Sequence, residues 1–91
     1  MKQFTKAQRH QIYKDAFVHF NEMWDKNRSH HFICNCIREV LDRQCKKFYI
    51  SDFPELRRNM PKDVLLYGAW WDTDEKEARV KVFEKIIKQT I

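Results

Sequence analysis

The stretch TKAQRHQIYKDAFVHFNEMW, residues 5–24, decides the fold of this chain. Its apolar residues recur three and four positions apart, which places them on one face of an α-helix. These residues are Ile12, Tyr13, Ala16, Phe17, Phe20, Met23 and Trp24. Thr5 and Gln8 have the spacing of a capping box, in which each side chain bonds the backbone N–H of the other residue. The sequence therefore predicts an amphipathic helix over residues 6–24.

Two later stretches repeat this periodicity, and we expect a helix in each. The first begins after Ser29, a candidate N-cap, and fades near Lys46 or Lys47. The apolar residues of its inner face are Ile33, Cys34, Ile37, Val40, Leu41 and Cys45. The second begins after Asp72 or Thr73, and its acidic first turn and basic last turn suit the helix dipole. Its apolar residues are Ala78, Val82, Phe83, Ile86 and Ile87.

Residues 48–71, between these two helices, are too many and too apolar for a bare loop. Ser51 to Leu56 has the pattern of a cap followed by Pro54 in the first turn of a short helix, which ends at 59–61. A second short turn starts at Pro61 and stops at Gly68. One glycine and two prolines leave little turn chemistry for β-hairpins. We expect an all-α fold: residues 1–91 form a single domain, a compact bundle of three main helices plus one or two short helices.

The composition excludes several classes of protein. Apolar residues make up 43% of the 91 and aromatic residues 14%, too many for a disordered chain. No apolar run approaches the roughly 18 residues of a membrane span, and residues 1–6 lack the apolar region of a signal peptide. The odd number of cysteines, Cys34, Cys36 and Cys45, does not suit a disulfide framework. We expect reduced thiols, a cytosolic location and no membrane partner.

Metal binding and thiol catalysis are the first chemistries to weigh. His30, His31, Cys34 and Cys36 fall within seven residues, but zinc sites usually combine two separated pairs of ligands. A second pair is missing, because Cys45 lies about 16 Å from Cys34 along a helix. We expect Cys34 and Cys45 to fill the core as small apolar groups. A His near a Cys is unremarkable with four histidines and three cysteines, so we expect no metal, no cofactor and no enzymatic activity.

Lysine and arginine exceed aspartate and glutamate by 18 to 13, a net charge of +5 that is unevenly spread. On the first helix, Lys6 and Arg9 share the apolar face, where a covered charge would be costly. We therefore expect the first turns to extend beyond the body of the domain and to present Lys2, Lys6 and Arg9 to an anionic partner. A frayed, solvated terminus is the alternative.

A second basic cluster mixes cations with aromatic rings. Its cations are Lys46, Lys47, Arg57 and Arg58, and its rings are Phe48 and Tyr49. Cations hold phosphates and rings stack on bases, so this pattern is typical of a surface for nucleic acid or an acidic groove. The alternative is that the rings close the core and the cations are merely solvated. On the second helix, by contrast, alternating charges around Glu39 and Asp42 indicate a solvated, ion-paired face.

The tandem Trp70-Trp71 is the third feature. Adjacent residues on a regular element cannot both face one core, so at least one indole should reach the surface. Tryptophan, tyrosine and arginine dominate binding hot spots. We expect Tyr67, Trp70, Trp71 and Arg79 to anchor a partner. The alternative is that a small core uses both rings.

Several of these motifs together resemble those of a known class. They are ICNCI at 33–37, FPEL at 53–56, Pro61, Trp70-Trp71 and Arg79. The pattern is similar to one in small proteins encoded by bacteriophages, prophages and mobile elements, and it spans roughly residues 32–91. Within that class the chain resembles an anti-CRISPR, directed against the RNA-guided RNA nucleases of type VI systems. The resemblance carries over no catalytic residue. It implies a stoichiometric inhibitor acting in the cytosol of the host bacterium.

We therefore expect a non-enzymatic protein that binds a bacterial immune nuclease, or interferes with its guide RNA, by occupying a surface. One alternative is a small regulator that binds RNA or DNA without a protein target. A second is a sponge for a small nucleotide signal, which needs a deep pocket.

Overall fold

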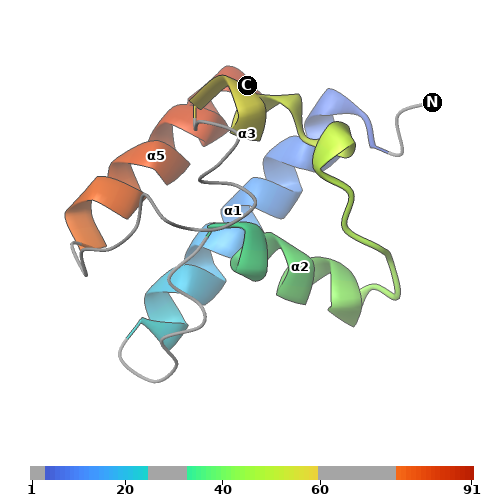
Figure 1. Cartoon of the computed structure of the whole chain (residues 1–91), viewed down its shortest axis with the longest axis horizontal. Coiled ribbons are helices and arrows are strands. Elements are labelled where there is room, and N and C mark those ends of the chain that lie inside the picture. Colours follow the sequence, from blue (N-terminus) through green and yellow to red (C-terminus); the bar gives the residue numbers. More distant parts are fainter. Residues whose placement is uncertain (1–3, 25–32, 60–75) are drawn as a thin grey trace.

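A computed structural model of the chain describes residues 4–24, 33–59 and 76–91, and every regular element in these ranges is helical (Figure 1). The elements, in chain order, are α1 (Lys6–Met23), α2 (Ile33–Arg43), the 3₁₀ helix η2 (Ile50–Asp52), α3 (Pro54–Asn59) and α5 (Lys76–Gln89). Three main helices, one short helix and a 3₁₀ turn confirm the predicted fold class. The second predicted short turn and the predicted caps of α2 and α5 lie outside the described residues.

Helix α1 lies at the centre, with α2 on one side and α5 on the other (Figure 1). The predicted capping box is confirmed: the Thr5 N–H donates to Gln8 Oε1 (2.8 Å) and the Gln8 N–H donates to Thr5 Oγ1 (3.1 Å). The buried apolar face of α1 includes Ile12, Ala16 and Phe20, as the periodicity predicts. The amphipathic helix α1 therefore packs against both of the other long helices, α2 and α5.

The core is rich in aromatic rings that come from every part of the described chain. Phe83 of α5 stacks on Phe17 of α1, with ring centroids 5.2 Å apart, and also contacts Phe20 at 5.3 Å. Phe53 and Leu56, around the start of α3, are fully buried beside them in the same core. Rings supply a large apolar area per residue, which a domain of this size needs.

The prediction that Cys34 and Cys45 fill the core is confirmed in part for Cys34, which packs against the core, and is wrong for Cys45. Cys36 is buried, Cys34 is half-buried and Cys45 is exposed. Cys36 shares a face with Ile33, Ile37 and Val40 through spacings of three and four residues, so it enters the core. Cys45 lies beyond the helix, because α2 ends at Arg43 rather than near Lys46.

A Schellman motif ends α2. The Lys46 N–H donates to the Leu41 carbonyl (2.9 Å), and the Cys45 N–H donates to the Asp42 carbonyl (3.1 Å). Cys45 has φ of 56°, the left-handed conformation that this motif requires and that usually selects glycine. The sequence has no glycine or asparagine here, so the helix end carried no recognisable signal. The motif turns the chain back toward the start of α1 and fixes the position of Lys46.

The predicted short helix after this turn is confirmed. α3 begins at Pro54, whose missing N–H costs nothing in the first helical turn, and ends at Asn59. The preceding residues form η2, and the Phe53 N–H donates to the Ile50 carbonyl at its end. Phe53 is thereby carried inward to the core, while the Phe48–Tyr49 segment before it runs along the surface.

Candidate functional site

The structure corrects the prediction for the amino-terminal cations. Lys6 is exposed, but Arg9 is buried, with 6% of its surface accessible, so it is not available to an outside partner. Lys2 lies outside the described residues. The prediction failed because it assumed that a charge on the apolar face would find no partner. Glu55 of α3 supplies one from a position 46 residues later in the chain.

Arg9, Tyr13 and Glu55 form a buried polar network between α1 and α3. Arg9 donates from Nε to Glu55 Oε1 (3.0 Å) and from Nη2 to Oε2 (3.2 Å), a bidentate pair. The Tyr13 hydroxyl donates to Oε1 as well (2.9 Å). Burial by itself raises the pKa of the Glu55 carboxyl, but the hydrogen bonds from Arg9 and Tyr13 outweigh it and lower that pKa. Burial raises the pKa of Tyr13, and the adjacent carboxylate raises it further.

The prediction that Arg79 belongs to an exposed aromatic anchor is also wrong. Arg79 is fully buried, and its guanidinium lies over the ring of Trp24, 5.5 Å from the centroid. A planar guanidinium stacks readily on an indole, which lets a charged residue serve as packing between α1 and α5. Tyr67, Trp70 and Trp71, the other predicted anchors, lie outside the described residues and remain predictions.

The second basic cluster is at the surface. Lys46, Lys47, Arg57 and Arg58 are all exposed, and Tyr49 is 53% exposed. Arg57 and Arg58 form the last turn of α3, whereas Lys46 and Lys47 follow the Schellman turn. Of these four cations, Lys46 lies over an aromatic ring of the described residues, that of Phe4.

Three rings and two cations form a continuous series, which we call the cation–ring row. Its members, in spatial order, are Lys46, Phe4, Phe53, Phe48 and Arg38. The Lys46 ammonium lies 5.4 Å from the Phe4 centroid, and the Arg38 guanidinium carbon lies 5.5 Å from the Phe48 centroid. The three ring centroids are 5.5 Å apart at each step. The row therefore has a buried middle, Phe53, and an exposed cation at each end.

The buried network positions this row. The Arg9 guanidinium also donates from Nη1 to the Phe4 carbonyl (3.1 Å), which fixes the backbone of the ring beneath Lys46. Tyr13, whose hydroxyl binds Glu55, places its ring edge against Phe53, 5.7 Å between centroids. The cations that the sequence assigned to a partner surface therefore have two different environments. Arg9 supports the site from inside, and Lys46 faces solvent.

Phe4, Phe53 and Arg38 are the members of the row that the sequence did not place in a site. Arg38 belongs to the charged face of α2 around Glu39, which was expected to be solvated. It is exposed, and in addition it lies over Phe48 and donates to Asn35 Oδ1 (3.2 Å). Asn35 and Arg38 are three residues apart on the same helix, a spacing that predicts contact between their side chains. The contact of Arg38 with Phe48 could not be predicted from the sequence, because it depends on the chain reversal after α2.

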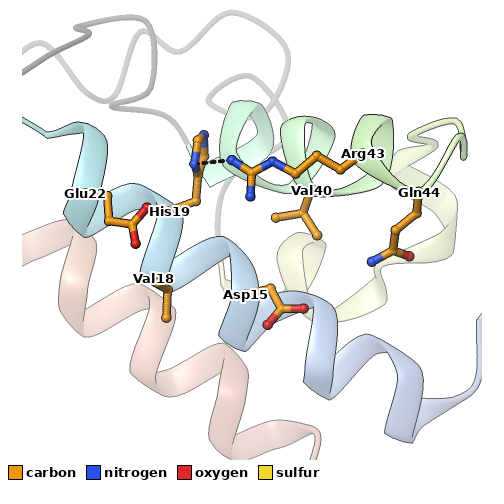
Figure 2. A pocket seen from close by; sticks show the side chains of 7 residues that line it. All are labelled: Asp15, Val18, His19, Glu22, Val40, Arg43 and Gln44. Atoms are coloured by element: carbon orange, nitrogen blue, oxygen red, sulfur yellow. Dashed lines mark hydrogen bonds between the residues drawn. The ribbon is translucent and has the colours of Figure 1, made fainter.

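A shallow groove follows the seam between α1 and α2, with a volume of about 240 Å³ (Figure 2). Asp15, Val18 and Glu22 of α1 form one wall, and Val40 and Arg43 of α2 form the other. Figure 2 shows the Arg43 guanidinium reaching His19 of α1, where Nη2 donates to Nδ1 (3.0 Å). Because arginine only donates, Nδ1 accepts, and the ring proton of His19 lies on Nε2.

A second hollow of about 150 Å³ continues this groove toward the amino end of α1. Both hollows share Asp15 and Gln44, and the second one reaches Phe4 and Lys46 of the cation–ring row. Two glutamines, Gln8 and Gln11, add amide groups to its wall. The groove and the row are therefore adjacent parts of one surface.

The thiols of α2 are poorly suited to nucleophilic or metal chemistry. Burial raises the pKa of Cys34 to about 11 and that of Cys36 to about 12, so both are protonated at neutral pH. Within residues 4–24, 33–59 and 76–91, no three His, Cys, Asp or Glu side chains lie close enough together to hold a metal ion. His30 and His31 lie outside these ranges.

In the part of the chain that the structure describes, no helix has both the length and the apolar character needed to cross a bilayer. Comparison with protein-family models, with curated protein sequences and with solved structures finds no match for the chain.

Proposed function

We propose that this protein acts by binding rather than by catalysis, and that an anionic partner docks on the cation–ring row. The observation that carries the proposal is the pair of exposed cations, Arg38 and Lys46, each held over an aromatic ring. A cation that is already positioned loses less side-chain entropy when a phosphate or carboxylate binds it. Exposed Lys47, with Arg57 and Arg58 on α3, adds positive charge to the same protein.

The resemblance to phage-type inhibitors makes a bacterial immune nuclease the first partner to test. In this proposal the protein occupies the guide-RNA region of a type VI RNA-guided nuclease in the bacterial cytosol. Occupancy alone blocks guide loading or target access, so no reaction chemistry is required of the inhibitor. The thiols of Cys34 and Cys36 agree with this proposal, because burial raises their pKa values and so disfavours the nucleophilic thiolate. Trp70-Trp71 remains the predicted protein-facing anchor.

The test is RNA cleavage by a type VI nuclease, titrated with this protein. We expect inhibition that saturates near one inhibitor per nuclease for the wild type, and weaker inhibition for a Lys46→Gln/Lys47→Gln variant. The matched control is Lys81→Gln/Lys85→Gln, which removes the same charge from exposed positions of α5. An equal loss of inhibition in both variants would mean that inhibition depends only on the net charge of the protein. No inhibition and no pull-down, with or without guide RNA, contradicts the nuclease as target.

The second candidate is a regulator that binds RNA or DNA without a protein target. The cation–ring row favours it, because cations and rings are sufficient for nucleic-acid binding by themselves. A gel shift with short RNA and DNA separates the two candidates. Binding to free nucleic acid without binding to any nuclease supports the regulator, and the converse supports the inhibitor.

A further inference from the structure

We infer that Arg38 and Phe48 form a stacking platform for an unpaired nucleobase. The cation–ring row would then bind one class of anionic partner, single-stranded nucleic acid. The inference rests on the proposed function, in which the row contacts an anionic partner. It goes further, because it requires a ligand that offers a flat π-face as well as a negative charge. An acidic protein surface offers the charge alone.

The platform is built outward from the core. Phe53 is fully buried and is held by contacts with Phe4, Tyr13 and Phe48. Phe48 lies on it at an interplanar angle of 19°, nearly parallel, and is half-buried. Arg38 lies over Phe48 and is exposed. From the core to the surface, the platform therefore consists of the buried ring of Phe53, the half-buried ring of Phe48 and the exposed guanidinium of Arg38.

Arg38 is fixed in two ways. Phe48 holds the guanidinium over its ring, and Asn35 accepts a hydrogen bond from Nη1 (3.2 Å). A guanidinium is planar and weakly hydrated, so its face stacks on a nucleobase while its edge donates to phosphate oxygens. A lysine ammonium group carries the same charge but has no planar face on which a base can stack. The choice of arginine at this position is therefore the feature that distinguishes base stacking from simple attraction.

The neighbouring residues extend the platform along the surface. Tyr49 follows Phe48 in an extended backbone conformation (φ −128°, ψ 127°), and 53% of its surface is accessible. Lys46, at the other end of the row, is exposed and supplies a contact for the phosphate backbone. A surface ring flanked by exposed cations suits a single strand, which offers unpaired bases for stacking and phosphates for ionic contact. A duplex presents the phosphates but keeps its bases stacked inside.

The experiment compares four fluorescent oligomers of about ten nucleotides by anisotropy. They are single-stranded RNA, single-stranded DNA, abasic RNA with the same number of phosphates, and duplex RNA. For the wild type we expect at least one of the two single strands to bind roughly tenfold more tightly than the abasic and duplex ligands. The comparison of RNA with DNA identifies which strand the site takes.

Variants separate stacking from charge. Arg38→Lys keeps the charge and should abolish the preference for bases over abasic RNA, as should Arg38→Gln. Arg57→Gln, the matched control, removes one charge from an exposed position of α3 and should weaken all four ligands by a similar factor. Circular dichroism and thermal melting of each variant confirm that the fold is retained.

Three results overturn the inference. If abasic RNA binds the wild type as tightly as single strands do, the row recognises charge only, and the proposed anionic docking survives without base stacking. If none of the oligomers binds, the platform is wrong. The nuclease titration with Lys46→Gln/Lys47→Gln then decides the proposed function independently. A preference for bases that persists in Arg38→Lys and Arg38→Gln likewise removes Arg38 from the platform.

Discussion

Arg9 of α1 and Glu55 of α3 form a bidentate ion pair inside the protein, with Nε–Oε1 and Nη2–Oε2 distances of 3.0 and 3.2 Å. The pair joins the first helix to a six-residue helix that could not be stable alone. Its arginine also binds the Phe4 carbonyl, and Phe4 carries Lys46 on its ring. One buried pair therefore supports both the position of α3 and one end of the cation–ring row.

Removing one member of this pair should be strongly destabilising. Glu55→Gln leaves the Arg9 guanidinium buried without a counter-charge, and such a change costs about 3 to 5 kcal/mol of the free energy of unfolding. Urea denaturation measures this loss. Glu84→Gln, at an exposed position of α5, is the control and should change stability by less than about 0.5 kcal/mol. A loss below about 1 kcal/mol for Glu55→Gln would mean that the pair contributes little.

The same carboxylate should make stability depend on acid. The pKa of Glu55 is lowered in the folded protein from its ordinary value of 4.5. The stabilisation from its charged form is therefore fully present above about pH 4.5 and is lost as the pH falls through the lower, folded-state value. The difference in unfolding free energy between wild type and Glu55→Gln should shrink on acidification. A difference that stays constant between about pH 7 and pH 3 would contradict this assignment.

The end of α2 should be improved by a glycine. Cys45 adopts φ of 56°, where a Cβ atom costs about 1 kcal/mol and glycine has no such penalty. Because Cys45 is exposed, Cys45→Gly loses little packing and should raise the unfolding free energy by about 0.5 to 1 kcal/mol. Cys45→Ala keeps the Cβ atom and should leave stability nearly unchanged. Equal effects of the two variants would assign the change to the thiol instead of the backbone.

The three thiols should differ sharply in reactivity. Cys45 is exposed, whereas burial raises the pKa of Cys34 to about 11 and that of Cys36 to about 12. Titration of the native protein with a disulfide reagent near neutral pH should show one rapidly reacting thiol, and the other two should react on unfolding. Cys45→Ser should remove the rapid phase. Rapid reaction of a second thiol in native protein would show that α2 opens readily.

The helical elements could be predicted because their signals are local. The spacing of Ile12, Ala16 and Phe20, the Thr5 and Gln8 capping box, and Pro54 in a first turn each depend on residues within a few positions of one another. The end of α2 was missed because Cys45 occupies a position where glycine is the usual signal. The backbone hydrogen bonds of the Schellman motif hold Cys45 in a left-handed conformation that its residue type does not favour.

The site was predicted only in part, since burial of charge is a long-range property. Lys46 and Lys47 are exposed as expected, but Arg9 and Arg79 turned out to be internal. Arg38 is exposed, as its place on the charged face of α2 indicated, but its contact with Phe48 depends on a chain reversal and could not be predicted. A sequence gives the charge of each residue, whereas the environment of that charge depends on what folds against it.

The sequence by itself determined that the chain forms amphipathic helices, because helical periodicity and capping are set by neighbouring residues. Only the tertiary structure decided which cations are buried and which face solvent. Arg9 is neutralised by Glu55 and Arg79 is packed on Trp24, while Arg38 and Lys46 remain at the surface over Phe48 and Phe4. The physical reason is that a buried charge is stable only beside a partner, and these partners come from distant parts of the chain.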